Sequence, residues 1–266
     1  KTVDQFLHVV ERAEDPALQF RTDVDSGQLV ISGLGELHLE VVVDRLQDDY
    51  GLEIRTGRPA VSYRTAITKV VRHREKLQKQ NGGKGQFAEI VVEVSPMPDG
   101  TGFLFENAIV GGAIPGQFVP SIEKGLRNGL KRGLADGNPI DGVHVRLVDG
   151  SIHREDSDAM AFELCAVSAI LAACQNAGPV TMEPVMQVEV LCPELYTGAV
   201  IGDLNRRRGR IGALEATNQG QAIAAAVPLS EMFGYVATLR GLSAGTGSYS
   251  MRLSHYAAVS SPVMAG

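Results

Sequence analysis

The amino-acid sequence predicts an α+β protein in which two βαββαβ units flank a central α+β domain. Three observations support this prediction. The last third of the chain has the complete order strand, helix, strand, strand, helix, strand. The first 57 residues have the same order without its first strand, and the segment between them combines long strands with two helices. Because βαββαβ is the order of a ferredoxin-like split βαβ fold, we expect that fold at both ends.

The first unit begins with an amphipathic helix over residues 2–14, which an Asp-Pro pair ends. Alternating apolar residues over 18–20 and 28–32, separated by an Asp-Ser-Gly turn, predict a β-hairpin. Apolar residues at helical spacing predict a helix over 39–50, and residues 52–56 predict the closing strand. The chain therefore begins partway into this unit.

The last unit has six predicted elements, bounded by turn residues such as Asn, Gln and Gly. They are a strand over 185–191, a helix over 194–208, strands over 210–217 and 221–228, a helix over 230–240 and a strand over 248–256. We expect the hydroxyl of Ser230 to cap the second helix.

The central block also has six predicted elements. They are strands over 61–72, 87–94, 103–109 and 143–148, and helices over 118–132 and 157–176. We expect Asp156 or Ser157 to cap the second helix, which a Gly-Pro pair ends. An apolar line at helical spacing supports this helix, namely Met160, Leu164, Val167 and Leu171.

The composition argues against a membrane or secretory protein. No uncharged apolar run approaches the roughly 18 to 20 residues that cross a bilayer, and the charged N-terminal segment is unlike a signal peptide. The three cysteines, Cys165, Cys174 and Cys192, are too widely spaced for a disulfide framework or a paired metal site. We interpret them as buried thiols of a protein in a reducing compartment.

The net charge of -6 by itself argues against a nucleic-acid binder. Basic residues are nevertheless concentrated locally, with seven of them and one acid between Arg64 and Lys84. Two shorter clusters follow, one at Lys124, Arg127, Lys131 and Arg132 and one at Arg206, Arg207, Arg208 and Arg210. Such clusters attract phosphate where they share a surface, although a solvated protein face is the alternative interpretation.

No stretch of the sequence matches the phosphate-binding loop of a nucleotide hydrolase. The closest, GGKG at residues 82–85, lacks the spacing and the hydroxyl that would hold magnesium, so we expect no GTP hydrolysis by this chain. The run HRED at 153–156 is a candidate for acid-base catalysis or metal binding, but no second His or Cys lies at a usable spacing. We therefore predict neither a catalytic residue nor a metal site.

A basic, glycine-rich segment, QNGGKGQ, occupies residues 80–86. Its three glycines remove side-chain bulk, while Lys79 and Lys84 supply positive charge. These features favour close approach of backbone N–H groups to nucleic acid. A plain hairpin connection is the alternative interpretation.

Several longer motifs resemble the elongation factor G family of translational GTPases. ISGLGELHLE at residues 31–40 is similar to the signature of that family's domain III. GGAIPGQFVPSIEKGL at 111–126 and DGSIHREDSDAMAF at 149–162 resemble domain IV, and EPVMQVEV, IGDLNRRRG and PLSEMFGYVATLR resemble domain V. The resemblance implies domain III over 1–57, domain IV with a ribosomal-protein-like fold over 58–180, domain V over 181–259 and a tail over 260–266.

The resemblance also implies two contact sites. The tip of domain IV, which in the family enters the decoding region beside transfer RNA and messenger RNA, corresponds to Lys79, Gln80, Asn81, Gly82, Gly83, Lys84, Gly85, Gln86 and His153. The domain V segment associated with ribosomal RNA corresponds to Arg206, Arg207, Arg208 and Arg210. This tip departs from the family's usual SGGRGQYG at Asn81, Lys84, Phe87 and Ala88, and lysine lacks the bidentate geometry of arginine.

The resemblance implies that the chain is the ribosome-binding part of a factor that promotes GTP-dependent translocation of transfer RNA and messenger RNA. It implies that GTP and Mg²⁺ are bound by an N-terminal GTPase domain of the same protein and that the protein is a monomer in the cytoplasm or an organelle matrix. A recycling or ribosome-protection paralogue is one alternative, because the tip is altered. The others are a generic RNA-binding module and a stand-alone enzyme centred on His153, Glu155 and Asp156.

Overall fold

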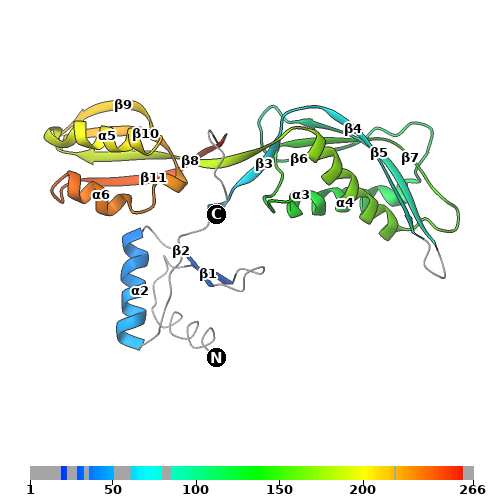
Figure 1. Cartoon of the computed structure of the whole chain (residues 1–266), viewed down its shortest axis with the longest axis horizontal. Helices are drawn as coiled ribbons and strands as arrows, with labels where there is room; N and C mark the ends of the chain where they lie inside the picture. The colour runs from blue at the N-terminus through cyan, green and yellow to red at the C-terminus, as the bar shows by residue number, and fades with distance from the viewer. Residues whose placement is uncertain are drawn as a thin grey trace. The chain divides into compact units, whose positions relative to one another are not determined.

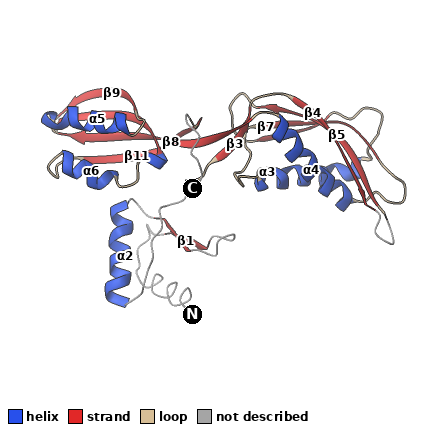
Figure 2. Cartoon of the chain, viewed as in Figure 1, coloured by secondary structure: helices blue, strands red, loops and turns tan. Residues whose placement is uncertain are grey.

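The computed structural model of the chain describes residues 19–22, 29–32, 36–50, 61–79, 85–218 and 220–259. It divides the chain into two compact units (Figure 1). One unit combines Lys1–Ala60 with Met186–Arg252, and the other combines Val61–Val185 with Leu253–Gly266. Both contain helices and strands, which confirms the predicted α+β class (Figure 2).

The described N-terminal residues form a hairpin followed by a helix. Strand β1 (Gln19–Thr22) pairs antiparallel with β2 (Leu29–Ser32). Helix α2 (Glu36–Tyr50) follows, and its Leu46 is buried. The predicted hairpin and this helix are confirmed, whereas the helix predicted over 2–14 and the strand predicted over 52–56 lie outside the described residues.

The unit of residues 61–185 is built on a four-stranded sheet. Its strands are β4 (Val71–Lys79), β5 (Gln86–Pro96), β6 (Phe103–Asn107) and β7 (Val143–Ser151), in the spatial order β4-β5-β7-β6. Neighbours are antiparallel except β6 and β7, which run parallel. A parallel pair needs a crossover connection, and the helix between these strands supplies it. Fully buried Ile90, Val92 and Val145 face the core from the sheet.

Helices α3 (Val119–Arg132) and α4 (Ala159–Asn176) cover one face of this sheet (Figure 2). They lie very close to each other because α3 has glycine at two contact positions. A Cβ at Gly125 would lie 2.3 Å from the backbone oxygen of Glu163, and one at Gly129 would lie 2.3 Å from the side chain of Ile170. This close packing fixes which face of α3 points to solvent.

The N-cap of α4 differs from the prediction. Asp158 is the cap, because its carboxylate accepts a hydrogen bond of 2.7 Å from the Ala161 N–H. Ser157 is unavailable, since its hydroxyl donates to the backbone oxygen of Phe87 at 2.8 Å. The prediction that Asp156 or Ser157 caps this helix was therefore wrong. The bonding partner of Ser157 lies 70 positions away in the sequence, so a local pattern could not reveal it.

The apolar line of α4 marks its buried side only in part, since Leu171 packs against the core. Met160 is 64% exposed and Leu164 is 42% exposed, whereas the neighbouring Ala161, Phe162 and Cys165 are fully buried. Both sides of the helix are apolar, so periodicity alone did not identify the buried one. Among the described residues, α4 is the one helix long and apolar enough to cross a membrane. Its core position explains that composition, because eight of its residues are buried in the core between α3 and the sheet.

The predicted strand over 61–72 is two strands in different sheets. Strand β3 (Arg64–Ile67) pairs antiparallel with the start of β8 (Pro179–Cys192), whereas β4 begins at Val71. Between them, the N–H groups of Thr68 and Lys69 both donate to the backbone oxygen of Ala177, at 3.0 and 2.9 Å. This long-range contact at the end of α4 interrupts a run that is continuous in the sequence.

The last unit has the predicted βαββαβ order. Its elements are β8, α5 (Thr197–Arg206), β9 (Arg210–Thr217), β10 (Gly220–Pro228), α6 (Tyr235–Leu242) and β11 (Ser248–Ala258), with strand order β11-β8-β10-β9. Both helices contribute to its core, in which Leu204, Ile223 and Tyr235 are fully buried. The ferredoxin-like prediction for this unit is confirmed.

Helix α6 begins later than predicted. Ser230 lies in a 3-10 turn, Leu229–Glu231, and the helix starts only after Gly234, whose φ of 71° is left-handed. Glycine adopts this conformation without steric cost, so it separates the turn from the helix. Ser230 therefore does not cap α6, and its hydroxyl accepts a hydrogen bond from Arg208 instead.

Candidate functional site

Two of the predicted tip residues, Lys79 and Gln86, lie at the facing ends of β4 and β5 (Figure 1). The two strands remain paired from Val71 and Val94 to Lys79 and Gln86, which are the last partners before the connection. Lys79 is exposed. The predicted tip residues Gln80, Asn81, Gly82, Gly83 and Lys84 lie outside the described residues.

The end of this hairpin is hydrogen-bonded to the turn that contains His153. The Phe87 N–H donates to the backbone oxygen of Asp156 at 2.8 Å, and the Ser157 hydroxyl donates to the backbone oxygen of Phe87 at 2.8 Å. The same hydroxyl accepts from the His153 N–H at 2.9 Å. The structure thus brings the end of the hairpin and the His153 turn together, which the resemblance alone had associated. Nothing in the sequence indicated that Ser157 links them.

The His153 ring and the Asp156 carboxyl group face each other across the turn, with 3.1 Å between Nδ1 and Oδ2. The Asp156 carboxyl group also occupies the space beside Gly85, where an added Cβ would meet its atoms at 2.8 to 2.9 Å. A side chain at position 85 would therefore displace the Asp156 carboxyl group from its place in the turn. The Phe87 ring completes this arrangement, with 6.2 Å between its centroid and that of His153.

The geometry does not favour an enzyme centred on this turn. Catalysis by a hydroxyl needs a base bonded to it, but the Ser157 hydroxyl bonds to two backbone groups rather than to the His153 ring. Glu155 is exposed. In the described part of the chain, no three His, Cys, Asp or Glu side chains converge as a metal site would require.

The long basic stretch between Arg64 and Lys84 is not one patch. Arg64 lies on β3, pairs with Asp141 and stacks on Tyr256 at 4.2 Å. Arg72, Arg74 and Lys76 alternate on β4 and point away from the helices, as their exposure shows.

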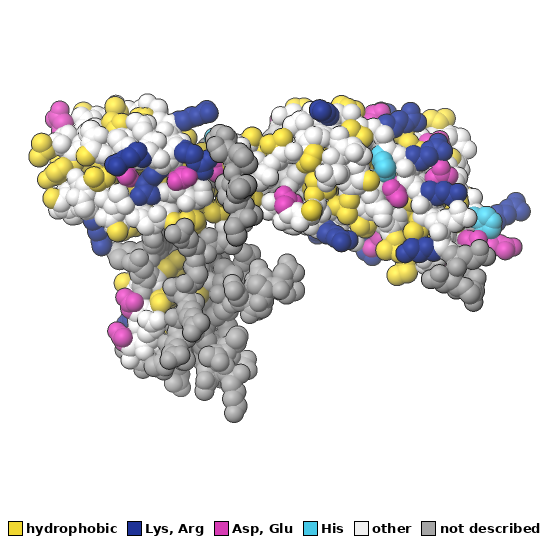
Figure 3. All heavy atoms as spheres, in the orientation of Figure 1, with side chains coloured by type: hydrophobic (Ala, Val, Ile, Leu, Met, Phe, Trp, Pro, Cys, Tyr) yellow, Lys and Arg dark blue, Asp and Glu magenta, His cyan; other side chains and the backbone are white. Residues whose placement is uncertain are grey.

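Carboxylates neutralise part of this outer sheet face. Arg74 pairs with Glu89 at 3.0 Å, and Arg146 pairs with Glu93 at 3.0 Å and with Glu106 at 3.2 Å. The hydrogen bond that Arg146 donates to the Glu93 carboxylate raises the pKa of its guanidinium. Figure 3 shows the same mixture, with basic and acidic side chains interspersed over this unit. The outer face is therefore a network of ion pairs rather than a uniformly basic surface.

Arg207 is held inside the last unit, with its side chain 17% exposed. Its Nε donates to Asp203 at 2.8 Å, its Nη2 donates to Thr238 at 3.0 Å, and its Nη1 donates to the backbone oxygen of Glu231. Its guanidinium also lies over the Tyr235 ring, 4.9 Å from the centroid. These contacts occupy the group that was predicted to contact ribosomal RNA.

The other three arginines of this cluster are placed differently. The Arg206 side chain is 75% exposed, and its nearest carboxylate oxygen, on Asp203, is 3.6 Å away. Arg208 has a left-handed φ of 57° and pairs with Glu231 at 2.9 Å. Arg210 is exposed at the start of β9. The Arg206–Arg210 cluster therefore presents Arg206 and Arg210 most freely to a partner.

All three cysteines are free and buried. Burial raises the pKa of the Cys165 thiol to about 11 and that of Cys174 to about 12, and it also raises the pKa of Cys192. A thiol that stays protonated at neutral pH is neither a good nucleophile nor a ready metal ligand. These residues serve as core side chains.

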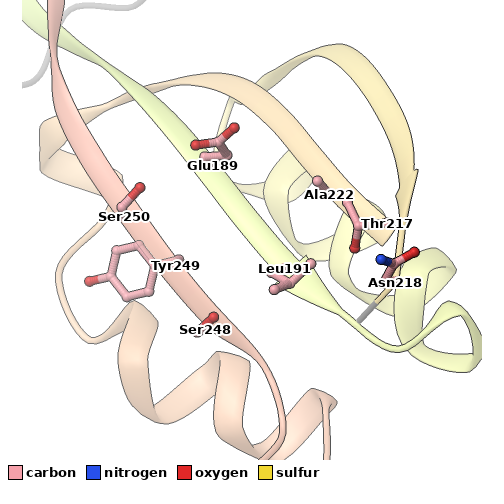
Figure 4. Close-up of a pocket in the computed structure, with 8 residues that line it drawn as sticks. All are labelled: Glu189, Leu191, Thr217, Asn218, Ala222, Ser248, Tyr249 and Ser250. Carbon is pink, nitrogen blue, oxygen red and sulfur yellow. The ribbon is translucent and has the colours of Figure 1, made fainter. Parts of the chain in front are cut away.

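A depression of about 520 Å³ lies over the last unit, on β8, β10 and β11 and the end of β9 (Figure 4). Glu189 is its single charged lining residue, and small or aliphatic side chains such as Ala222 and Ser250 form much of the rest. A small-molecule site usually combines an apolar cavity with several convergent polar groups. The polar side chains of this depression, such as Asn218 and Ser250, are spread over separate segments rather than gathered at one point (Figure 4).

Known proteins resemble this chain both in sequence and in fold. Family models match residues 1–58 as elongation factor G domain III, residues 59–190 as domain IV and residues 180–265 as the elongation factor G C-terminus. Elongation factor G of Cytophaga hutchinsonii is 49% identical over 244 residues, and that of Aquifex pyrophilus is 45% identical over 254 residues.

These alignments cover 91% and 96% of this chain but only 35% and 36% of the two relatives, so the chain spans about a third of their length. A crystal structure of a Thermus thermophilus protein covers 98% of this chain, with a TM-score of 0.85 and 36% sequence identity. The chain covers 39% of that protein. Matches in the same order along the whole sequence, together with the shared fold, show that this chain belongs to the elongation factor G family.

Proposed function

We propose that the chain is the ribosome-binding C-terminal part of a translation factor that promotes GTP-dependent translocation of transfer RNA and messenger RNA. Family membership supports the class of partner. The arrangement at the end of the β4–β5 hairpin supports the role of this segment, because a turn that is hydrogen-bonded to the strand end and has no catalytic geometry suits a contact surface.

The hydrogen bonds between Phe87 and residues Asp156 and Ser157 carry this proposal. They make the base of the glycine-rich segment and the His153 turn one unit, so both enter a binding site together. In this role the chain neither makes nor breaks a covalent bond. It binds one ribosomal state more tightly than the other and shifts their equilibrium by that difference in affinity.

Other parts of the mechanism belong to the rest of the protein and to the ribosome. We propose that GTP and Mg²⁺ are bound by an N-terminal GTPase domain outside these 266 residues and that the factor works as a cytoplasmic monomer. Arg206, Arg208 and Arg210 would contact ribosomal RNA, whereas Arg207 would hold the segment that carries them.

A recycling or ribosome-protection role is the second candidate, and one sequence feature favours it. Lys84 and Phe87 replace the arginine and tyrosine that are usual at the tip of the family. Lysine keeps the charge but not the bidentate geometry, so contacts at the decoding region would differ. An assay that separates transfer RNA movement from subunit splitting distinguishes the two roles.

The test is to replace Lys79 and Lys84 with alanine in a full-length protein that carries this chain. We expect single-turnover translocation to slow strongly while ribosome binding survives, because other basic residues supply separate phosphate contacts. The slope of log affinity against log salt should fall in magnitude by no more than about 2.

The matched control is Lys69→Ala with Arg72→Ala, which removes the same charge from the same unit but away from the hairpin end. This variant should translocate normally. If the Lys79→Ala, Lys84→Ala variant translocated normally but lost ribosome binding, the proposed role of the tip would be contradicted. If the unmodified protein split ribosomal subunits rapidly without translocation, the second candidate would be favoured.

A further inference from the structure

The basic cluster at Lys124, Arg127, Lys131 and Arg132 lies on α3, a part of the unit that the proposed tip does not include. All four residues are exposed, and they share one side of the helix with Asn128. The opposite side is buried against α4 and the sheet, with Ile122, Gly125, Leu126, Gly129 and Leu130 as its buried residues. An overall net charge of -6 makes this concentration of cations distinctive.

Two carboxylates hold only the N-terminal half of this basic face. Lys124 pairs with Glu163 at 2.9 Å, and Arg127 pairs with Glu123 at 2.8 Å. Within the described part of the chain, the side chains of Lys131 and Arg132 form neither an ion pair nor a hydrogen bond with another residue. Positive charge therefore remains unneutralised at the C-terminal turn of α3.

Capping of the helix does not account for these two cations. Lysine and arginine often occur in a last turn because their side chains bond to the free carbonyl oxygens there. In α3 the backbone oxygen of Gly129 accepts from the Gly133 N–H at 3.2 Å, and that of Leu130 accepts from the Ile140 N–H at 2.8 Å. Backbone groups thus perform the capping, and the two side chains extend into solvent.

The close packing of α3 on α4 makes this surface rigid. Any side chain larger than hydrogen at Gly125 or Gly129 would collide with α4, so the helix cannot rotate without breaking that contact. A fixed set of cations loses less conformational freedom on binding than a flexible loop does. Lys124 and Lys131 are seven residues apart, which spaces their Cα atoms by about 10 Å along the helix.

The C-terminal turn of α3, with Lys131 and Arg132, is also far from the tip. The end of α3 is bonded to Ile140, just before β7 begins at Val143, whereas the His153 turn follows the other end of β7 at Ser151. Nine strand residues separate these ends by about 27 Å. A ligand bound at the tip would not reach the last turn of α3 unless it were itself extended.

From these observations we propose that the exposed face of α3, defined by Lys124, Arg127, Asn128, Lys131 and Arg132, binds the phosphate backbone of ribosomal RNA as a second anchor of this unit. The inference rests on the proposed ribosome-binding function. Phosphate is the ligand that fits, because the surface offers several cations on a rigid helix, and the nearby Phe103 ring is covered by the Arg127 guanidinium, 4.7 Å from its centroid.

The test measures binding of the 266-residue chain to ribosomes across a range of salt concentrations. Lys131→Ala with Arg132→Ala should reduce the magnitude of the log-affinity against log-salt slope by about 1.4 to 1.8. Between 50 and 200 mM salt, the unmodified chain should therefore lose about tenfold more affinity than the variant. Lys131→Gln with Arg132→Gln, which keeps long side chains, should behave in the same way, and both variants should melt within a few degrees of the unmodified chain.

Lys69→Ala with Arg72→Ala is the matched control, since it removes one lysine and one arginine from exposed positions at the same end of the unit, outside α3. It should leave the slope within about 0.5 of the unmodified value. Equal slopes for the unmodified chain and both Lys131–Arg132 variants would overturn the inference while leaving the proposed function intact. Failure of the unmodified chain to bind ribosomes would overturn both.

A second measurement identifies the chemistry of the partner. Because the native cysteines are buried, an Asn128→Cys variant can carry a hydroxyl-radical-generating iron chelate at the centre of the surface. Cleavage of ribosomal RNA from this position is the expected result. Cleavage confined to ribosomal protein would show that an acidic protein surface occupies the site and would overturn the assignment to RNA.

Discussion

Replacing Arg207 with alanine should destabilise the C-terminal unit, although the sequence groups this residue with three surface arginines. The change removes hydrogen bonds to Asp203, to Thr238 and to a backbone oxygen, together with the stacking contact on Tyr235. It also leaves the Asp203 carboxylate, whose side chain is 11% exposed, without its closest cation.

The expected loss follows from this burial. Removing one partner of a fully buried ion pair costs about 3 to 5 kcal/mol, because the other charge stays desolvated. Here both side chains retain some exposure, and Arg206 lies 3.6 Å from the same carboxylate, so it offers partial replacement. We therefore expect the free energy of unfolding of this unit to fall by about 2 to 4 kcal/mol.

Hydrogen exchange in the intact chain measures this quantity for each unit separately. Amides of α5 and β10 that exchange by opening of the unit should exchange roughly 30 to 1,000 times faster in the Arg207→Ala variant, since 1.4 kcal/mol is tenfold. Peptides of α3, in the other unit, serve as the internal reference and should be unchanged. Arg206→Ala is the control, with an expected cost below about 1 kcal/mol because its side chain is exposed. Equal and small effects of the two variants would refute the reasoning.

Three further predictions concern other positions. Gly85→Ala should slow translocation in a full-length protein but leave its melting temperature unchanged, because the new Cβ would lie 2.8 Å from the Asp156 carboxyl group. Gly116→Ala, whose new Cβ would meet no atom within 4 Å, should change neither the translocation rate nor the melting temperature. Arg208→Gly should be about 1 kcal/mol more stable than Arg208→Ala in the same exchange assay, since φ there is 57°, and equal stability would contradict this strain argument. Burial raises the pKa of Cys165 from 9.0 to about 11. The stability that its protonated thiol contributes should therefore be complete below pH 9 and decrease from pH 9 to 11. Alkaline denaturation of the unmodified chain and of a Cys165→Ala variant would show this difference.

The order of the elements was predictable because it depends on local features of the sequence. The strand predicted over 210–217 is β9 with the same bounds, and the predicted hairpins and most helices were found within a few residues. Turn residues and side-chain periodicity act over a few positions, so they can be read without knowing the rest of the fold. Glycine content and local charge pointed to the tip and arginine segments, whereas their contact roles come from family resemblance and stay predictions.

Tertiary structure decided which side of an element is buried and which polar group is already bonded. The sequence by itself determined that α4 is an apolar helix, but contacts with α3 and the sheet decided that Ala161 and Phe162, rather than Met160, face the core. The sequence likewise determined that four arginines lie close together near 206–210, but Thr238, 31 residues away, helps to hold Arg207 inside. Ser157 and Phe87 are 70 residues apart, yet their bond gives the serine a linking role in place of the predicted cap. Each of these outcomes depends on a partner that is distant in the sequence, and a local pattern contains no information about which partner will reach a given side chain.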